Sequence, residues 1–137
     1  SEYGFGAVIA ALPGFAAIAG ALQAIPNPLL NAAVTVTTLA GITGSASGGL
    51  GIALAAMAEQ FAAAAQAAGI PLEVMHRVVA MASGGMDTLP HNGAVITVLA
   101  VTGLTHRQSY RDIFAITCIK TLAVFFVIGV YYLTGWV

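Results

Sequence analysis

The chain has 137 residues, of which 59% are hydrophobic and only 7% are charged. Because an ordinary soluble domain carries about 25% charged residues, this composition excludes a soluble globular protein, and the long uncharged stretches favour a bilayer as the solvent. The formal net charge of −1 provides no basic patch, which argues against a nucleic-acid partner.

The first predicted element is a transmembrane helix in residues 1–25, kinked at Pro13 because proline removes a backbone donor. Pro26 and Pro28 end it in an extended turn. The N-terminus lacks an initiator Met, a basic region and a convincing cleavage site, so we expect no signal peptide. We interpret the chain as a piece of a longer protein.

The second predicted element, residues 28–68, consists of two helices separated by a break. The break is the sequence TGSASGG, from Thr43 to Gly49, where small polar residues and glycines give a helix little reason to continue. Gly69 and Pro71 then form a conventional helix stop.

The third predicted element, residues 71–105, crosses the membrane as two half-helices. The first, residues 71–83, is only about 20 Å long at 1.5 Å per residue, which is too short to cross alone. The sequence MASGGMDTLPHNGAV at 81–95 interrupts the apolar pattern, so we expect an unwound middle at 84–92.

The last predicted element is a transmembrane helix over residues 113–136, preceded by a charged loop at 106–112. Arg107 and Arg111 place that loop in the cytoplasm by the positive-inside rule. We expect Lys120 to extend along the helix towards the cytoplasm, with contact to an anion as the alternative.

The two breaks predict a binding site, because irregular backbone at membrane depth must be buried in protein or line a wet cavity. Secondary transporters build substrate sites from such discontinuous helices. Substrate-binding candidates are the small and polar residues of the breaks, namely Ser45, Ser47, Gly48, Gly49, Ser83, Gly84, Gly85, Thr88 and Asn92.

Asp87 and His91 are the candidates for coupling substrate movement to an ion, because a membrane carboxylate and an imidazole can both take up protons. Each has a structural alternative. Asp87 could instead cap a helix, and His91 could instead bond a neighbouring carbonyl. Asn92, one of the substrate-binding candidates, could serve merely as the cap of the second half-helix.

Enzyme and metal templates do not match this sequence. The three histidines form neither HExxH nor a His/Cys cluster, and no serine lies in GxSxG. We therefore expect no catalytic residues, no metal and no cofactor other than a coupling ion. A protease subunit that uses Asp87 with an acid from another segment, and a structural subunit whose breaks only serve packing, stay open as alternatives.

Two motifs, TGSASGGLGIAL at 43–54 and MASGGMDTLPHNGAVITVLAVTGLTH at 81–106, resemble the C-terminal part of the gluconate permease (GntP) family of proton symporters in the ion transporter superfamily. The resemblance covers nearly the whole chain in order and spacing. Sugar-acid members typically have a Ser-His-x-Asn-Asp run, whereas residues 89–93 read LPHNG and lack the acid. The sequence looks more similar to the hydroxybutyrate and small-carboxylate branch.

The resemblance implies an all-α integral membrane fold in which this chain is the second of two inverted repeats. Residues 28–68 would be a re-entrant hairpin with its tip at 44–49, followed by the broken helix. The implied activity is proton-coupled import of a small organic acid, such as gluconate or 3-hydroxybutyrate, by a multi-pass protein of the bacterial inner membrane. Implied partners are the carboxylate substrate, the bilayer, the N-terminal repeat and further copies in a homo-oligomer.

Overall fold

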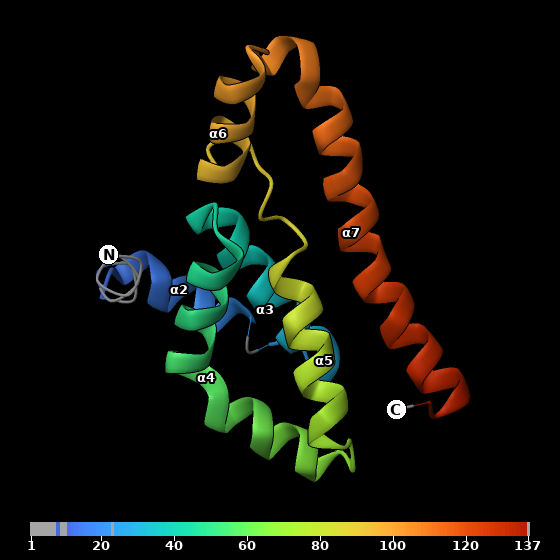
Figure 1. The fold of residues 1–137 in the computed structure, drawn as a ribbon. Coiled ribbons are helices and arrows are strands. Elements are labelled where there is room, and N and C mark those ends of the chain that lie inside the picture. The colour runs from blue at the N-terminus through green and yellow to red at the C-terminus, as the bar shows by residue number, and fades with distance from the viewer. Residues whose placement is uncertain (1–7, 9–10, 23, 137) are drawn as a thin grey trace.

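The structure is a computed structural model that describes residues 8, 11–22 and 24–136. Within these ranges every regular element longer than a turn is a helix, as the sequence predicts. In Figure 1 most of the helices gather in one cluster, and the long last helix begins above this cluster and runs down along one side of it. The helices are α2 (Pro13–Leu22), α3 (Pro28–Thr43), α4 (Ala46–Ala67), α5 (Leu72–Ser83), α6 (Gly93–Thr102) and α7 (His106–Thr134).

Helix α3 is the centre of the packing, because it contacts α2, α4, α5 and α7. Most of its side chains are buried, including Leu29, Val36 and Leu39. Its alanines allow neighbouring backbones to approach closely, as small residues do in membrane bundles. Residues of α4, α5 and α7 complete the core around it, among them Ile52, Met57, Phe61, Val74, Val78, Val124 and Ile128.

The turn between α3 and α4 is shorter than the sequence predicts. It consists of Gly44 and Ser45, whereas residues 46–49 belong to the first turn of α4. Gly44 has φ +62°, a left-handed conformation that glycine adopts without steric penalty. The Ser45 hydroxyl accepts a hydrogen bond from the Gly48 N–H at 3.1 Å and so caps α4. One capping serine is thus enough to start the next helix within the glycine-rich run.

Helices α5 and α6 are separated by residues 84–92, which form turns and bends. Figure 1 shows this segment as the extended connection between the lower helices and α6. Asn92 begins α6 because its side-chain oxygen accepts from the Val95 N–H at 3.0 Å. The bounds of the irregular segment are those that the sequence predicts.

The expectation of a loop at residues 106–112 is wrong, because α7 already begins at His106. Thr105 precedes that helix, and its backbone N–H donates to the Gln108 side chain at 2.9 Å. This is the capping-box spacing of a Thr followed three residues later by a Gln. The charged residues therefore occupy the first turns of α7 and lie on the helix itself.

The first predicted helix is only partly described. Helix α2 begins at Pro13, so the proline starts a helix where we expected a kink within a longer one. Most of the segment before it, residues 1–7, 9 and 10, lies outside the described residues.

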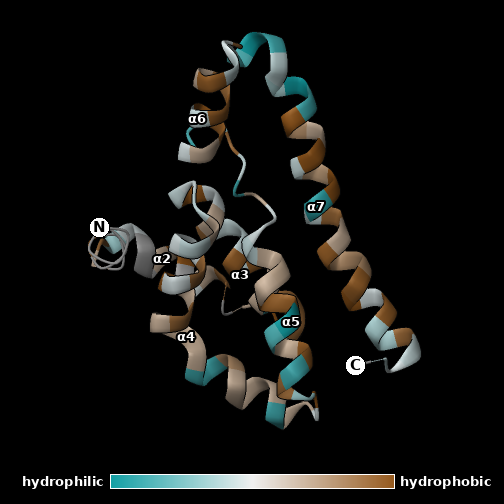
Figure 2. Ribbon diagram, in the orientation of Figure 1, coloured by the Kyte–Doolittle hydropathy of each residue, from teal (hydrophilic) through white to brown (hydrophobic). Residues whose placement is uncertain are grey.

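Among the residues that the structure describes, two helices, α4 and α7, are long and apolar enough to cross a membrane. Figure 2 shows brown, hydrophobic residues along much of α7 and on α6. Several of these side chains are exposed, for example Ile119, Leu122 and Phe126 on α7. An apolar surface of this extent fits lipid or another part of a membrane protein better than water.

Candidate binding site at the two helix breaks

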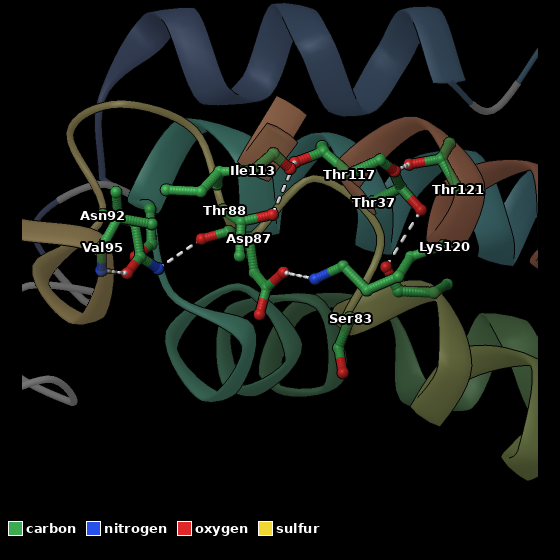
Figure 3. A network of polar contacts seen from close by, with 12 residues as sticks. Thr37, Ser83, Asp87, Thr88, Asn92, Val95, Ile113, Thr117, Lys120 and Thr121 are labelled. Carbon is green, nitrogen blue, oxygen red and sulfur yellow. Dashed lines mark hydrogen bonds and ion pairs between the residues drawn. The ribbon is translucent and has the colours of Figure 1, made fainter. Parts of the chain in front are cut away.

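Asn92 joins the two helix breaks. Its amide nitrogen donates to the Gly44 carbonyl at 2.6 Å and also to the Asp87 carbonyl, while its oxygen caps α6. Figure 3 shows Asn92 with its bonds to Asp87 and Val95. The residue is 6% exposed, so both halves of the amide are used in a buried place. Asn92 thus caps a helix, as one sequence alternative proposed, and also binds the turn of the hairpin.

This contact brings the N-termini of two helices close together. Helix α4 begins directly after Ser45, and α6 begins directly after Asn92. The N-terminus of a helix carries a partial positive charge and backbone N–H groups that favour anions. Of the predicted substrate-binding residues, Ser45, Gly48 and Asn92 lie at this junction, and Ser47 lies within 3.3 Å of Ser45, measured between their hydroxyl oxygens.

His91 lies against the turn of the hairpin. A Cβ added to Gly44 would lie 2.7 Å from Cδ2 of the His91 ring, so only glycine allows this contact. The His91 side chain is otherwise exposed. His91, the second coupling candidate, therefore lies beside the junction of the two breaks with an exposed side chain.

Asp87 forms an ion pair with Lys120, which lies on α7. The distance between Lys120 Nζ and Asp87 Oδ1 is 2.6 Å, and the side chains are 34% and 21% exposed. Lys120 is at the middle of α7, about 21 Å from either end at 1.5 Å per residue. The expectation that Lys120 extends to the cytoplasmic end of the helix is therefore wrong. Its ammonium group pairs instead with the carboxylate of Asp87 in the segment 84–92 (Figure 3).

A second contact ties the unwound segment to α7. The hydroxyls of Thr88 and Thr117 are 2.6 Å apart, and the Thr117 hydroxyl also contacts the Ile113 carbonyl at 3.0 Å. The Tyr110 hydroxyl donates to the Thr88 carbonyl at 3.4 Å. Thr88, a predicted substrate-binding residue, is thus already engaged by α7.

Helix α3 holds the beginning of the unwound segment. The Thr37 hydroxyl donates to the Ala82 carbonyl at 3.0 Å, near the C-terminus of α5. Gly85 packs against the same threonine, because a Cβ there would lie 3.1 Å from the Thr37 side chain. Gly85 therefore provides close packing between α3 and the break.

Three other predicted residues serve the helices that contain them. The Ser83 hydroxyl is buried and donates to the Ala80 carbonyl of its own helix at 2.8 Å. Gly84 caps the C-terminus of α5. A Cβ on Gly49 would lie 2.3 Å from the Ala40 backbone nitrogen, so this glycine lets α3 and α4 cross.

An open hollow of about 490 Å³ lies beside the junction, lined by Pro90, His91, His106, Arg107 and Tyr110. His106 contacts the Pro90 carbonyl through Nε2 at 3.0 Å, which joins the start of α7 to the unwound segment. Two imidazoles and a guanidinium make this hollow a suitable surface for an anion. The part of the chain that the structure describes contains no group of three His, Cys, Asp or Glu that could hold a metal.

Three side chains of this site, those of Lys120, Thr37 and Thr117, were not among the residues predicted from the sequence to form it. A signal for Lys120 was present, because it is the only charged residue between Asp112 and the end of the chain. Intramembrane lysines are rare and pair with other polar groups. The two threonines carry no such signal, since threonine occurs throughout α3 and α7.

Comparison with known proteins shows a close similarity to a longer bacterial protein. The chain is 72% identical, over 138 aligned positions that include all of it, to the protein named "Uncharacterized transporter YxjC" of Bacillus subtilis (strain 168). The chain spans 29% of the length of that protein. No family model matches the chain, and no solved structure is similar to it. Over its whole length, the chain is thus similar to one part of a longer protein named as a transporter.

Proposed function

We propose that this chain is the second repeat of a secondary active transporter that imports a small organic acid together with a proton across the bacterial inner membrane. The observation that carries this proposal is the meeting of two helix N-termini, those of α4 and α6, through the Asn92–Gly44 contact. Discontinuous helices that present their N-termini to an anionic group are a known way to bind a substrate carboxylate.

The charges around the junction support an anionic substrate. Lys120 supplies a cation on one side, and Arg107 supplies another in the hollow that His91 and His106 also line. Ser45, Ser47 and the backbone N–H groups of the α4 N-terminus offer hydrogen bonds to a carboxylate or hydroxyl. A small hydroxy acid such as 3-hydroxybutyrate or gluconate has both groups.

Coupling to a proton requires a group near the substrate that changes charge. Asp87 and His91 are our candidates, because both lie in the unwound segment next to the junction. Asp87 is only partly exposed and has a cationic partner, so its protonation would change the electrostatics of the site directly.

The relative and the composition support transport in a membrane. The Bacillus protein bears the name of a transporter, and α4 and α7 have the length and hydropathy of membrane spans. The resemblance to the gluconate permease family supports the finer points, namely a re-entrant hairpin at 28–68, inverted repeats, proton coupling and a homo-oligomer. The remaining portion of the transporter would supply the other half of the site.

Uptake into liposomes tests the proposal. Full-length protein would be reconstituted, and uptake of labelled 3-hydroxybutyrate and gluconate measured with and without an inward proton gradient. We expect accumulation of one of these acids only when the gradient is present. Failure of both acids, and then of a wider panel of small carboxylates, would contradict the proposal, and turnover that is independent of any ion gradient would favour a membrane enzyme.

A further inference from the structure

The pairing of Lys120 with Asp87 joins the middle of α7 to the break that forms one wall of the proposed site. Lys120 Nζ donates to a single carboxylate oxygen of Asp87, and both side chains retain some exposure. A cation in this place has one protein carboxylate as its partner. Asp87 also accepts through its carbonyl from Asn92, at the junction of the two helix N-termini that would attract a second carboxylate. The two carboxylates would therefore compete for the same ammonium group.

The neighbouring elements contribute few other charges to this place. Helices α2, α3 and α6 contain no titratable side chain, and α4 contains only Glu59. The titratable side chains of α5 lie in its first half, and they are Glu73, His76 and Arg77. The titratable side chains of α7 other than Lys120 lie mostly near its ends, and they are His106, Arg107, Tyr110, Arg111, Asp112, Cys118, Tyr131 and Tyr132.

The nearest of these along α7 does not share the face of Lys120. Cys118 precedes it by two residues, and residues at that spacing on a helix do not face each other. Within the unwound segment, His91 is the other titratable side chain, and its ring lies against Gly44. Asp87 is thus the group whose charge decides what Lys120 can bind.

Resting on the function proposed above, we infer that Lys120 is the receptor for the substrate carboxylate and that Asp87 competes with the substrate for it. When Asp87 takes a proton from water, its charge is lost and the ion pair with Lys120 weakens. The substrate carboxylate then pairs with the ammonium group, which stays protonated throughout. Return of the proton to water on the other side restores the Asp87–Lys120 pair and expels the substrate.

This competition fixes the stoichiometry. One proton on Asp87 accompanies one substrate carboxylate on Lys120, so the charge of the site is the same in the empty and loaded states. A monocarboxylate would therefore move electroneutrally. A gradient of one pH unit would accumulate the acid about tenfold, and a membrane potential alone would accumulate none.

The deciding experiment uses full-length wild-type protein in liposomes, with the acid that it accumulates. A potassium diffusion potential of about 100 mV, inside negative, would be imposed at equal pH on both sides. If one net positive charge moved with the substrate, this potential would drive accumulation of about fiftyfold. We expect none, whereas one pH unit gives the tenfold value. Potential-driven accumulation would overturn the inference while leaving the transporter function intact.

Variants test the two residues separately. Asp87→Asn should exchange internal for external substrate at a rate independent of pH but lose gradient-driven accumulation. Lys120→Met should lose both activities, and Lys120→Arg should retain exchange. Glu73→Gln is the matched control, because it neutralises a carboxylate of an exposed pair with Arg77 at 3.9 Å on α5. It should behave as wild type.

The outcomes separate this inference from the proposed function. Proton-driven accumulation by Asp87→Asn, or full exchange by Lys120→Met, would overturn the inference alone. If the wild type accumulates no acid at all, the proposed function fails and the inference fails with it. The potential-driven measurement uses the wild-type protein, so it tests the inference even if a variant does not fold.

Discussion

The two helix breaks differ in where their stabilising contacts come from. The turn at Gly44 and Ser45 is stabilised mainly by neighbours in sequence, since the Thr43 hydroxyl contacts the Leu39 carbonyl at 2.8 Å and Ser45 caps α4. The segment 84–92 depends on distant residues, because Gly85 packs against Thr37 of α3, Asp87 and Thr88 bond to Lys120 and Thr117 of α7, and Asn92 donates to the Gly44 carbonyl. The first break is thus stabilised mainly by local contacts, whereas most side-chain contacts of the second come from other elements.

This difference bears on the mechanism that we propose. A locally stabilised turn holds its shape while other parts of the molecule move. A segment whose contacts come from three other elements can exchange them when a charge changes or a ligand binds. We therefore expect the hairpin turn to act as a fixed wall and the segment 84–92 to carry the conformational change.

The largest effect is expected from Gly49→Ala, which disturbs the fixed wall. The added Cβ would lie 2.3 Å from the Ala40 nitrogen and 2.4 Å from its Cα, and backbone atoms cannot turn away as a side chain can. Overpacking typically costs about 1–3 kcal/mol and occasionally more, and we expect a loss at or above the upper end. The measurement is the free energy of unfolding in mixed micelles, by titration with SDS.

Gly51→Ala on the same helix is the matched control. No atom within 4 Å would meet its Cβ, so it should leave the protein as stable or slightly more stable. Equal losses of stability in both variants would show that any added methyl group on α4 is destabilising. The close approach of α3 and α4 at Gly49 would then not be the cause.

Asn92 tests how far the second break depends on distant contacts. Asn92→Ala removes the cap of α6, which lowers the free energy of unfolding by about 1 kcal/mol. It also leaves the Gly44 carbonyl without its donor, which costs about a further 1–3 kcal/mol when the carbonyl is buried. Asn92→Asp keeps the capping oxygen but cannot donate. We expect a total loss of about 2–4 kcal/mol for Ala and a loss between Ala and wild type for Asp, whose added charge lies in a buried place.

Hydrogen exchange locates the effect of these variants. Amides in 84–92 should exchange faster in both, because the link to the hairpin is lost. The N-terminal amides of α6 should lose protection only in Asn92→Ala. If Asn92→Asp behaves as wild type in both regions, the bond to Gly44 contributes nothing and the break is as local as the first.

The sequence predicted both breaks because glycine, serine and proline interrupt an apolar pattern that otherwise continues. It placed 84–92 correctly, since the segment contains Pro90 and no apolar run. It overestimated the first break, because Ala46 to Gly49 follow a serine that caps a helix. It missed the start of α7 at His106, although Thr105 and Gln108 have the spacing of a capping box.

The contacts between the breaks could not be read from the chain alone. Which hydroxyl meets the Ala82 carbonyl, and which carboxylate meets Lys120, depends on how α3 and α7 pack across 84–92. Each such pair is far apart in sequence, by 45 residues for Thr37 and Ala82 and by 33 for Asp87 and Lys120. Local patterns identify residues that need partners but do not identify the partners.

Gly44→Ala separates backbone strain from the contact with His91. An alanine in the left-handed conformation costs about 1–2 kcal/mol, and its Cβ would also displace the His91 ring. Gly103→Ala is the control, because Gly103 has φ +68° and an open surrounding. We expect both to lower the melting temperature in detergent, and Gly44→Ala to lower it more. Equal shifts would mean that His91 moves aside freely.

The smallest change in stability is expected from Ser45→Ala, which removes the cap of α4 at about 1 kcal/mol. Ser45→Asp restores a capping oxygen and places a negative charge at the helix N-terminus, where it is favourable. Stability should therefore return. The same carboxylate, however, would occupy the place that we assign to the substrate anion, so uptake by Ser45→Asp should fall further than uptake by Ser45→Ala. If uptake instead recovers together with stability, Ser45 serves only as a cap, and the substrate carboxylate binds away from the α4 N-terminus.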